Sequence, residues 1–106
     1  MAHPGISAEL AGLGRELQSL GQGVLSAIAE RADLRLEKIV QRREELMRRL
    51  RILAQSHPQE VAACAELSEA AKQEPQLTVA ARARQEEIRL ELEDVLQRIA
   101  IRQTYL

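Results

Sequence analysis

The 106-residue chain carries 15 Lys and Arg against 16 Asp and Glu, a formal net charge of -1, which argues against a nucleic-acid-binding module because such modules are usually basic overall. Its single cysteine, Cys64, excludes an internal disulfide and favours a reducing compartment, so we expect a cytoplasmic protein. Tyr105 is the only aromatic residue, and an interior of Leu, Ile, Val and Ala is typical of helical bundles and coiled coils.

The first predicted helix covers residues 7–30 and follows a tail, residues 1–6, that we expect to be disordered. Ser7 is a candidate N-cap. The large apolar residues that follow have helical spacing: Leu10, Leu13, Leu17, Leu20, Val24 and Ile28. Four glycines lie among them, and each costs about 1 kcal/mol relative to alanine inside a helix. We therefore expect this helix to be the least stable, unless its glycines pack closely against another backbone.

A second helix is predicted over residues 33–55. Its apolar residues form one face about 100° wide, made of Leu36, Ile39, Val40, Leu46, Met47, Leu50 and Leu53. The pattern can also be carried back through Ala32 to Ile28, so a tight turn and one continuous helix of about fifty residues both remain open. We favour the turn, because Asp33 is a plausible N-cap and an uncapped run longer than ~25 residues is unusual in a compact domain.

Arg43 lies on the apolar face of this second helix, where the spacing requires a core residue. Either its stem runs along the bundle edge and leaves the guanidinium in water, or it pairs with a carboxylate across the seam and fixes register or partner. Charge is uneven in this part of the chain: residues 33–57 carry seven basic and four acidic residues, whereas residues 58–77 carry four glutamates and Lys72. Opposite charges that face each other and two solvated surfaces both explain this distribution.

The clearest boundary is His57-Pro58, because a residue before proline avoids the helical region and proline suits the first position of a helix. We predict a short third helix over residues 58–73, stopped by Pro75, and a long fourth helix over residues 76–104. The expected fold is an all-α, antiparallel bundle of three to four helices in a single domain, residues 7–106. The second and fourth helices carry the strongest apolar stripes and are expected to pack on each other, with dimerisation as a second way to complete the bundle.

The sequence contains no constellation typical of a catalytic or metal site. His3 lies in the tail, His57 has no second ligand at metal-binding spacing, and Cys64 lies in an alanine-rich segment without an activating base. The glycines of the first helix do not follow a strand, so they form no phosphate-binding loop. We expect no enzyme activity, no cofactor and no metal. We also expect no membrane association, since no apolar run approaches the ~18 residues needed to cross a bilayer and no secretory signal is visible.

The segment ERADLRLEKIVQRREELMRRL, residues 30–50, resembles the leucine-arginine pattern of flagellar type III export chaperones of the FliT and FlgN kind. The final helix, which ends in IAIRQTYL, is similar to the last core helix of that family. The resemblance implies a cytoplasmic, all-helical chaperone that holds late flagellar subunits before export. The glycine-rich first helix and its lack of aromatic residues depart from the family pattern.

The resemblance implies a groove that receives an amphipathic helix of a client, and long apolar stripes in so small a domain favour the same interpretation. The expected partner-binding residues are Ile88, Leu92, Val95, Leu96 and Ile99 on the final helix, together with Arg43. The alternative is a structural protein, a helical hairpin that pairs with a second copy of itself and holds no client.

Overall fold

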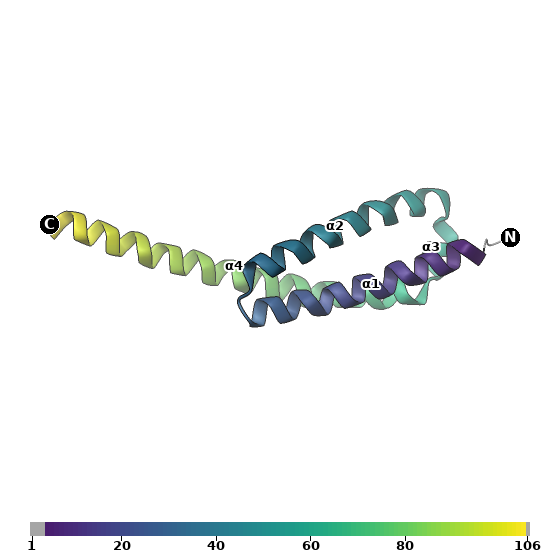
Figure 1. Ribbon diagram of the computed structural model, residues 1–106, viewed down its shortest axis with the longest axis horizontal. Coiled ribbons are helices and arrows are strands. Elements are labelled where there is room, and N and C mark those ends of the chain that lie inside the picture. The colour runs from purple at the N-terminus through teal and green to yellow at the C-terminus, as the bar shows by residue number, and fades with distance from the viewer. Residues whose placement is uncertain (1–3, 106) are drawn as a thin grey trace.

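The computed structural model describes residues 4–105, and every element in that range is a helix. The four helices are α1 (Pro4–Ala29), α2 (Asp33–Ser56), α3 (Pro58–Ala63) and α4 (Ala65–Tyr105). Together they form an elongated all-α bundle that measures 75 × 21 × 19 Å (Figure 1). The predicted fold class is therefore confirmed. Residues 4–6 of the predicted tail belong to α1, while the rest of that tail lies outside the described residues.

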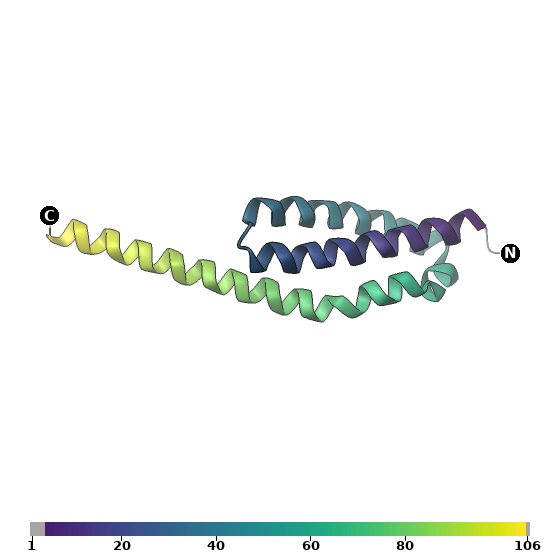
Figure 2. The same cartoon turned by 60° about the horizontal axis from the view of Figure 1, so that its bottom comes forward.

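The centre of the bundle is α1, because both α2 and α4 pack against it. Helix α2 runs antiparallel to α1, whereas α4 runs parallel to it on the other side (Figures 1 and 2). The prediction that the second and fourth helices pack directly on each other was wrong for their backbones, which hardly meet because both helices pack against α1. Side chains of α2 and α4 do meet, in the ion pairs Arg43–Glu74 and Asp33–Arg84. The helices with the longest apolar stripes, α2 and α4, each pack more closely on α1 than on each other, because small residues of α1 allow closer packing.

Two glycines explain why α1 is central. A Cβ added at Gly14 would lie 2.6 Å from the backbone carbonyl carbon of Glu66, and one added at Gly21 would collide with the side chain of Gln73. Both partners belong to α4. At Gly14 the close atoms include the α4 backbone, so this glycine lets α4 approach α1 more closely than a side chain would permit. At Gly21 the close atoms belong to the side chains of Gln73 and Leu77, so the condition of close packing against another backbone is met at Gly14. Both glycines are buried.

The core is built from leucine and alanine contributed by three helices. Its buried members are Leu10, Leu13 and Leu17 of α1, Leu46 and Leu53 of α2, and Leu67 and Ala70 of α4. Leu20, Met47, Leu50 and Val61 pack around them and are partly buried. This core occupies the half of the bundle that contains α3, and packing becomes more open toward the turn between α1 and α2.

The turn between α1 and α2 is present, so the continuous helix is excluded. Helix α1 ends at Ala29, and Arg31 adopts a left-handed backbone with φ of 55°. The N-cap of α2 is Ala32, which makes no side-chain cap, and Asp33 occupies the first turn. The predicted N-cap role of Asp33 was wrong, and so was that of Ser7, which lies inside α1.

The boundary at His57-Pro58 is confirmed, with Pro58 at the start of α3. The next two boundaries differ from the prediction, because α3 ends at Ala63 and α4 continues through Pro75. Cys64 interrupts the helix with an extended backbone, φ -76° and ψ 113°. The chain changes direction there, and α4 then places Leu67 and Ala70 in the core. Proline removes one helical hydrogen bond and bends a helix without having to end it. Helix α4 bends in its first half, where Pro75 lies (Figure 2).

Ion pairs on the α2 side only partly follow the predicted charge complementarity. Arg42 and Arg49 pair with Glu16 and Glu9 of α1, at 2.7 and 2.8 Å. Only Arg43 reaches the acidic segment 58–77, where it pairs with Glu74. The basic charge of α2 is thus shared between its two neighbours.

Candidate helix-binding groove and arm

The second half of α4 leaves the bundle. Beyond Arg84, every residue of α4 up to Thr104 is exposed, and the helix extends past the turn between α1 and α2 (Figures 1 and 2). We call residues 88–104 the arm. At about 1.5 Å per residue the arm is about 25 Å long, and it makes no packing contact that would bury its apolar side chains.

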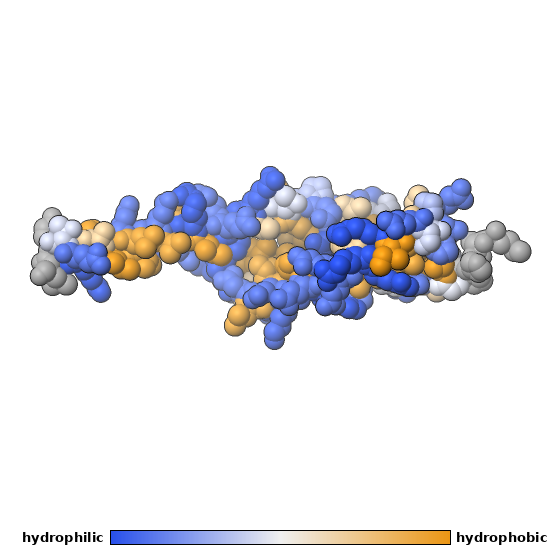
Figure 3. All heavy atoms as spheres, turned by 90° about the horizontal axis from the view of Figure 1, so that it is seen from above, coloured by the Kyte–Doolittle hydropathy of each residue, from blue (hydrophilic) through white to orange (hydrophobic). Residues whose placement is uncertain are grey.

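The arm carries the five apolar residues that the sequence singled out. Ile88, Leu92, Val95, Leu96 and Ile99 are between 43% and 56% exposed. In the space-filling view, apolar atoms form a band along the protruding part of α4 (Figure 3). The structure thus brings these five predicted residues together on one free surface, and their role in partner binding remains a prediction.

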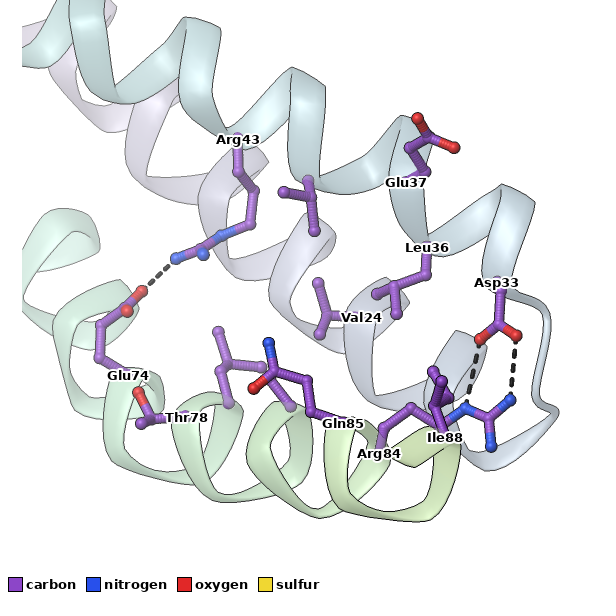
Figure 4. A pocket seen from close by; sticks show the side chains of 13 residues that line it. Val24, Asp33, Leu36, Glu37, Arg43, Glu74, Thr78, Arg84, Gln85 and Ile88 are labelled. Atoms are coloured by element: carbon purple, nitrogen blue, oxygen red, sulfur yellow. Dashed lines mark hydrogen bonds and ion pairs between the residues drawn. The ribbon is translucent and has the colours of Figure 1, made fainter. Parts of the chain in front are cut away.

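Where the arm meets the bundle, a groove runs between α2 and α4 with α1 as its floor. The groove has a volume of about 510 Å³. Its apolar lining comes from all three helices: Val24 of α1, Leu36 and Val40 of α2, and Leu77, Ala81 and Ile88 of α4 (Figure 4). The backbones of α2 and α4 do not meet over α1 here, so the groove between them is open along its length between the two ends.

An ion pair between α2 and α4 marks each end of the groove. Arg43 pairs with Glu74 at one end, and Arg84 pairs with Asp33 at the other (Figure 4). The two pairs are ten residues apart on each helix, so the interval between them is about 15 Å, or nearly three helical turns. The predicted pairing of Arg43 with a carboxylate across the seam is confirmed, whereas its exposure to water is not, since its side chain is only 21% exposed. Its Nε is buried without a hydrogen-bond partner among the described residues.

Arg84 is the most buried charged residue among those described, with 7% of its surface exposed. Its Nε and Nη2 donate to the two carboxylate oxygens of Asp33 at 3.2 and 2.9 Å, and its Nη1 donates to Glu87 at 3.0 Å. These hydrogen bonds lower the pKa of Asp33 below its usual value and raise that of Arg84. Both groups therefore stay charged over the whole neutral range.

Sequence reasoning missed the Arg84–Asp33 pair. It assigned Asp33 to a cap and did not single out Arg84. A signal was present, because Leu77, Ala81, Arg84 and Ile88 continue a 4,3,4 spacing in which Arg84 takes a core position, as Arg43 does in α2. Arg43 and Arg84 each interrupt an apolar stripe at a core position, which is the same signal for an ion pair inside the bundle. This signal was recognised at Arg43 and not at Arg84.

The groove and the arm share one continuous row of side chains on α4. Thr78, Ala81, Gln85 and Ile88 line the groove, and the same 3,4 alternation continues through Leu92, Val95 and Ile99. We call these seven residues the α4 seam. Such an alternation keeps side chains on one face of a helix that pairs with a second helix. Its full length, from Thr78 to Ile99, is about 32 Å.

Among residues 4–105, no helix is long and apolar enough to cross a membrane. The same residues contain no cluster of three or more His, Cys, Asp or Glu side chains that could hold a metal ion. Cys64 is partly buried, and its thiol lies 3.4 Å from the carboxylate of Glu66.

Comparison of the chain with models of protein families, with curated proteins and with solved structures yields no significant match. The geometry of the groove and of the arm is therefore the basis for a functional assignment.

Proposed function

We propose that this chain is a non-enzymatic binding protein whose α4 seam receives an amphipathic helix. One observation carries the proposal: four large apolar residues of the arm are exposed in a row that continues along α4 to the groove, namely Ile88, Leu92, Val95 and Ile99. An exposed row of this length on a rigid scaffold is the geometry of helix-in-groove recognition. The groove adds Val24, Leu36 and Val40 as a second wall, so an occupant would contact all three long helices at that end.

The arm itself supports the same proposal on energetic grounds. An isolated helix of this length is only marginally stable in water, because helices in proteins gain most of their stability by packing an apolar face. A seam with Ile88, Leu92, Val95 and Ile99 at regular spacing gains that packing when a second helix covers it. Four of the charged groups that line the groove are paired, Arg43 with Glu74 and Arg84 with Asp33, and they mark its ends, while Glu37 lies on the α2 wall between them.

The chemistry of the seam specifies the occupant. It is a helix with large aliphatic residues at i, i+3, i+4 and i+7 spacing. Residues 86–94 of α4 carry five carboxylates and one arginine, a net charge of -4, so a helix with basic residues beside its apolar stripe is favoured there. Combined with the resemblance of residues 30–50 to flagellar export chaperones, this leads us to propose a cytoplasmic chaperone that holds a helix of a late flagellar subunit.

The test is a titration of the protein with peptides that cover the terminal helices of late flagellar subunits from the same organism. Binding should show a negative heat-capacity change, since apolar surface is buried. The double variant Leu92→Ala, Val95→Ala should weaken binding. Leu90→Ala is the matched control, because Leu90 is 51% exposed on the same arm but lies off the seam. Equal loss in the seam variant and the control would contradict the proposal, and so would the absence of binding by any peptide.

A second candidate function is a helical adaptor that pairs with a copy of itself. The charge distribution of the arm favours it: residues 86–94 have a net charge of -4, whereas residues 95–104 carry Arg98 and Arg102 and no acidic residue, a net charge of +2. Opposite charge at the two ends of one exposed helix suits antiparallel pairing.

A further inference from the structure

We infer that in the free protein the arm is covered by the arm of a second copy, in an antiparallel pair with one defined register. The inference rests on the proposed function only in using the α4 seam as a helix-binding surface. It names the occupant when no client is present. The inference is based on three observations. They are the exposed seam, the opposite charges of its two ends, and the positions of Glu91 and Arg98.

The seam itself limits the registers that are available. In an antiparallel pair, seam residues of one helix must lie opposite seam residues of the other. When the two-fold axis passes between Leu92 and Val95, the central layers contain only large aliphatic side chains. Those layers are Ile88 opposite Ile99 and Leu92 opposite Val95, each occurring twice by symmetry.

The charges beside the seam select the same register. Glu91 precedes Leu92 and Arg98 precedes Ile99, so both lie on the same flank of the seam, two turns apart. An antiparallel two-fold axis brings that flank of one helix against the same flank of the other. With the axis between Leu92 and Val95, Glu91 of each copy lies opposite Arg98 of the second copy, which gives two complementary pairs.

The neighbouring registers are unfavourable. A shift of the axis toward the bundle places Gln85 opposite Val95 and sets Glu91 against Glu91. A shift toward the end of the arm sets Arg98 against Arg98 and places Arg102 opposite Leu92. Like charges directly opposite each other are destabilising. Parallel pairing is disfavoured too, because it lays the acidic segment 86–94 of one copy beside that of the other.

Glu91 and Arg98 are free to form these pairs. Arg98 contacts only Asp94 on its own helix, at 2.8 Å, with its side chain 74% exposed. Glu91 lies at the margin of ion-pair distance from Arg84, at 3.9 Å, and Arg84 keeps Asp33 and Glu87 when Glu91 turns away. In this register the basic end of the second arm also runs along α4 toward the groove, whose α2 wall carries Glu37.

The size of the interface predicts its strength. The overlapped segment from Ile88 to Ile99 is about 18 Å long on each helix. The area that so short a segment buries is smaller than the roughly 800 Å² per partner of a standard protein interface. Dimerisation should therefore occur in the micromolar range and weaken with salt. A weak pair leaves the seam accessible to a client helix that fills the groove as well.

The experiment is a charge exchange measured by sedimentation equilibrium. Glu91→Arg alone places an arginine at position 91 opposite Arg98 of the other copy, twice in the dimer. Arg98→Glu alone places a glutamate at position 98 opposite Glu91 of the other copy, also twice. Each variant should therefore dimerise about tenfold more weakly or worse. An equimolar mixture of the two variants restores both opposite-charge pairs and should form a heterodimer. The double variant Glu91→Arg, Arg98→Glu should dimerise like the unmodified chain.

Glu93→Arg is the matched control. It makes the same change of charge on the arm and loses the ion pair with Arg89, but it lies away from the seam, so it should weaken dimerisation far less than Glu91→Arg does. Circular dichroism of each variant checks that the helices are retained. The inference is overturned if the unmodified chain is monomeric at micromolar concentration, or if the mixture associates no better than either single variant.

A flagellar-subunit peptide separates this inference from the proposed function. If the second copy covers the seam, the peptide should bind the Arg98→Glu variant, which keeps the acidic segment 86–94, at lower concentration than it binds the unmodified chain. Peptide binding without dimerisation overturns the inference and leaves the proposed function standing. Dimerisation with the predicted charge exchange but without peptide binding supports the inference and contradicts the client.

Discussion

Arg84 donates two hydrogen bonds to the carboxylate of Asp33, 51 residues away in the chain. The contact joins the start of α2 to the last buried turn of α4, at the point where the arm leaves the bundle (Figure 4). Two parallel hydrogen bonds between a guanidinium and a carboxylate fix direction as well as distance. This pair therefore ties α2 to α4 where the arm begins and marks one end of the groove.

Breaking this pair should destabilise the bundle. Asp33→Asn and Arg84→Met are each expected to lower the midpoint of urea unfolding, because each leaves a partner group with fewer hydrogen bonds. The double variant should be more stable than the sum of the single effects predicts, since the two residues act as one unit. Arg31→Ala is the control: its pair with Glu87 is long, 3.9 Å, and exposed, so little change is expected. Additive single effects would show that the two groups are not coupled.

Stability should also depend on pH through Asp33. The hydrogen bonds from Arg84 lower the pKa of Asp33 in the folded chain. A depressed pKa stabilises the fold above the pKa of the unfolded chain, about 3.9, and this contribution disappears as the pH falls through the lower, folded value. Urea midpoints at pH 7 should therefore differ between the unmodified chain and Asp33→Asn, and the difference should shrink below about pH 4. A difference that is constant with pH would contradict this assignment.

The glycines of α1 should respond in opposite directions to alanine. At Gly14 the new methyl would collide with the backbone of Glu66, so α4 must move and the free energy of unfolding should fall by about 1–3 kcal/mol. At Gly12 no atom lies within 4 Å of the added Cβ. Gly12→Ala should therefore stabilise the chain by up to about 1 kcal/mol through helix propensity. Thermal melts of the two variants test the central position of α1, and stabilisation by both would refute it.

Core and arm leucines should also differ sharply. Leu46→Ala removes a buried side chain and should cost about 2–5 kcal/mol, a large part of a total stability of ~5–15 kcal/mol. Leu92→Ala, Leu96→Ala removes two half-exposed side chains, and each should change the free energy of unfolding by about 0.5 kcal/mol or less. The comparison uses dilute protein, because self-association adds stability at high concentration. A strongly destabilised arm variant would show that the arm is packed in solution.

The sequence was a good guide wherever the determinant was local. Helical periodicity and the absence of large aromatics predicted an all-α chain, and proline chemistry placed the His57-Pro58 boundary. The exposed row on the arm could be predicted by residue, from Ile88 to Ile99, because spacing alone puts these side chains on one face. Proline was less reliable at Pro75, since one lost hydrogen bond bends α4 but the packing of Leu77 on the same helix keeps it continuous.

Which helix packs on which was decided by tertiary structure, because stripe strength does not determine distance of approach. Gly14 lets the backbone of α4 come close to α1, and that contact outweighs the longer apolar stripe of α2. The same contact separates α2 from α4, opens the groove, and turns Arg43 and Arg84 from breaks in two stripes into the ion pairs at its ends. The positions of the helices and the apolar face of the arm were thus determined by the local periodicity of the sequence. The groove, by contrast, exists only because α2 and α4 both pack on α1 and leave a space between them.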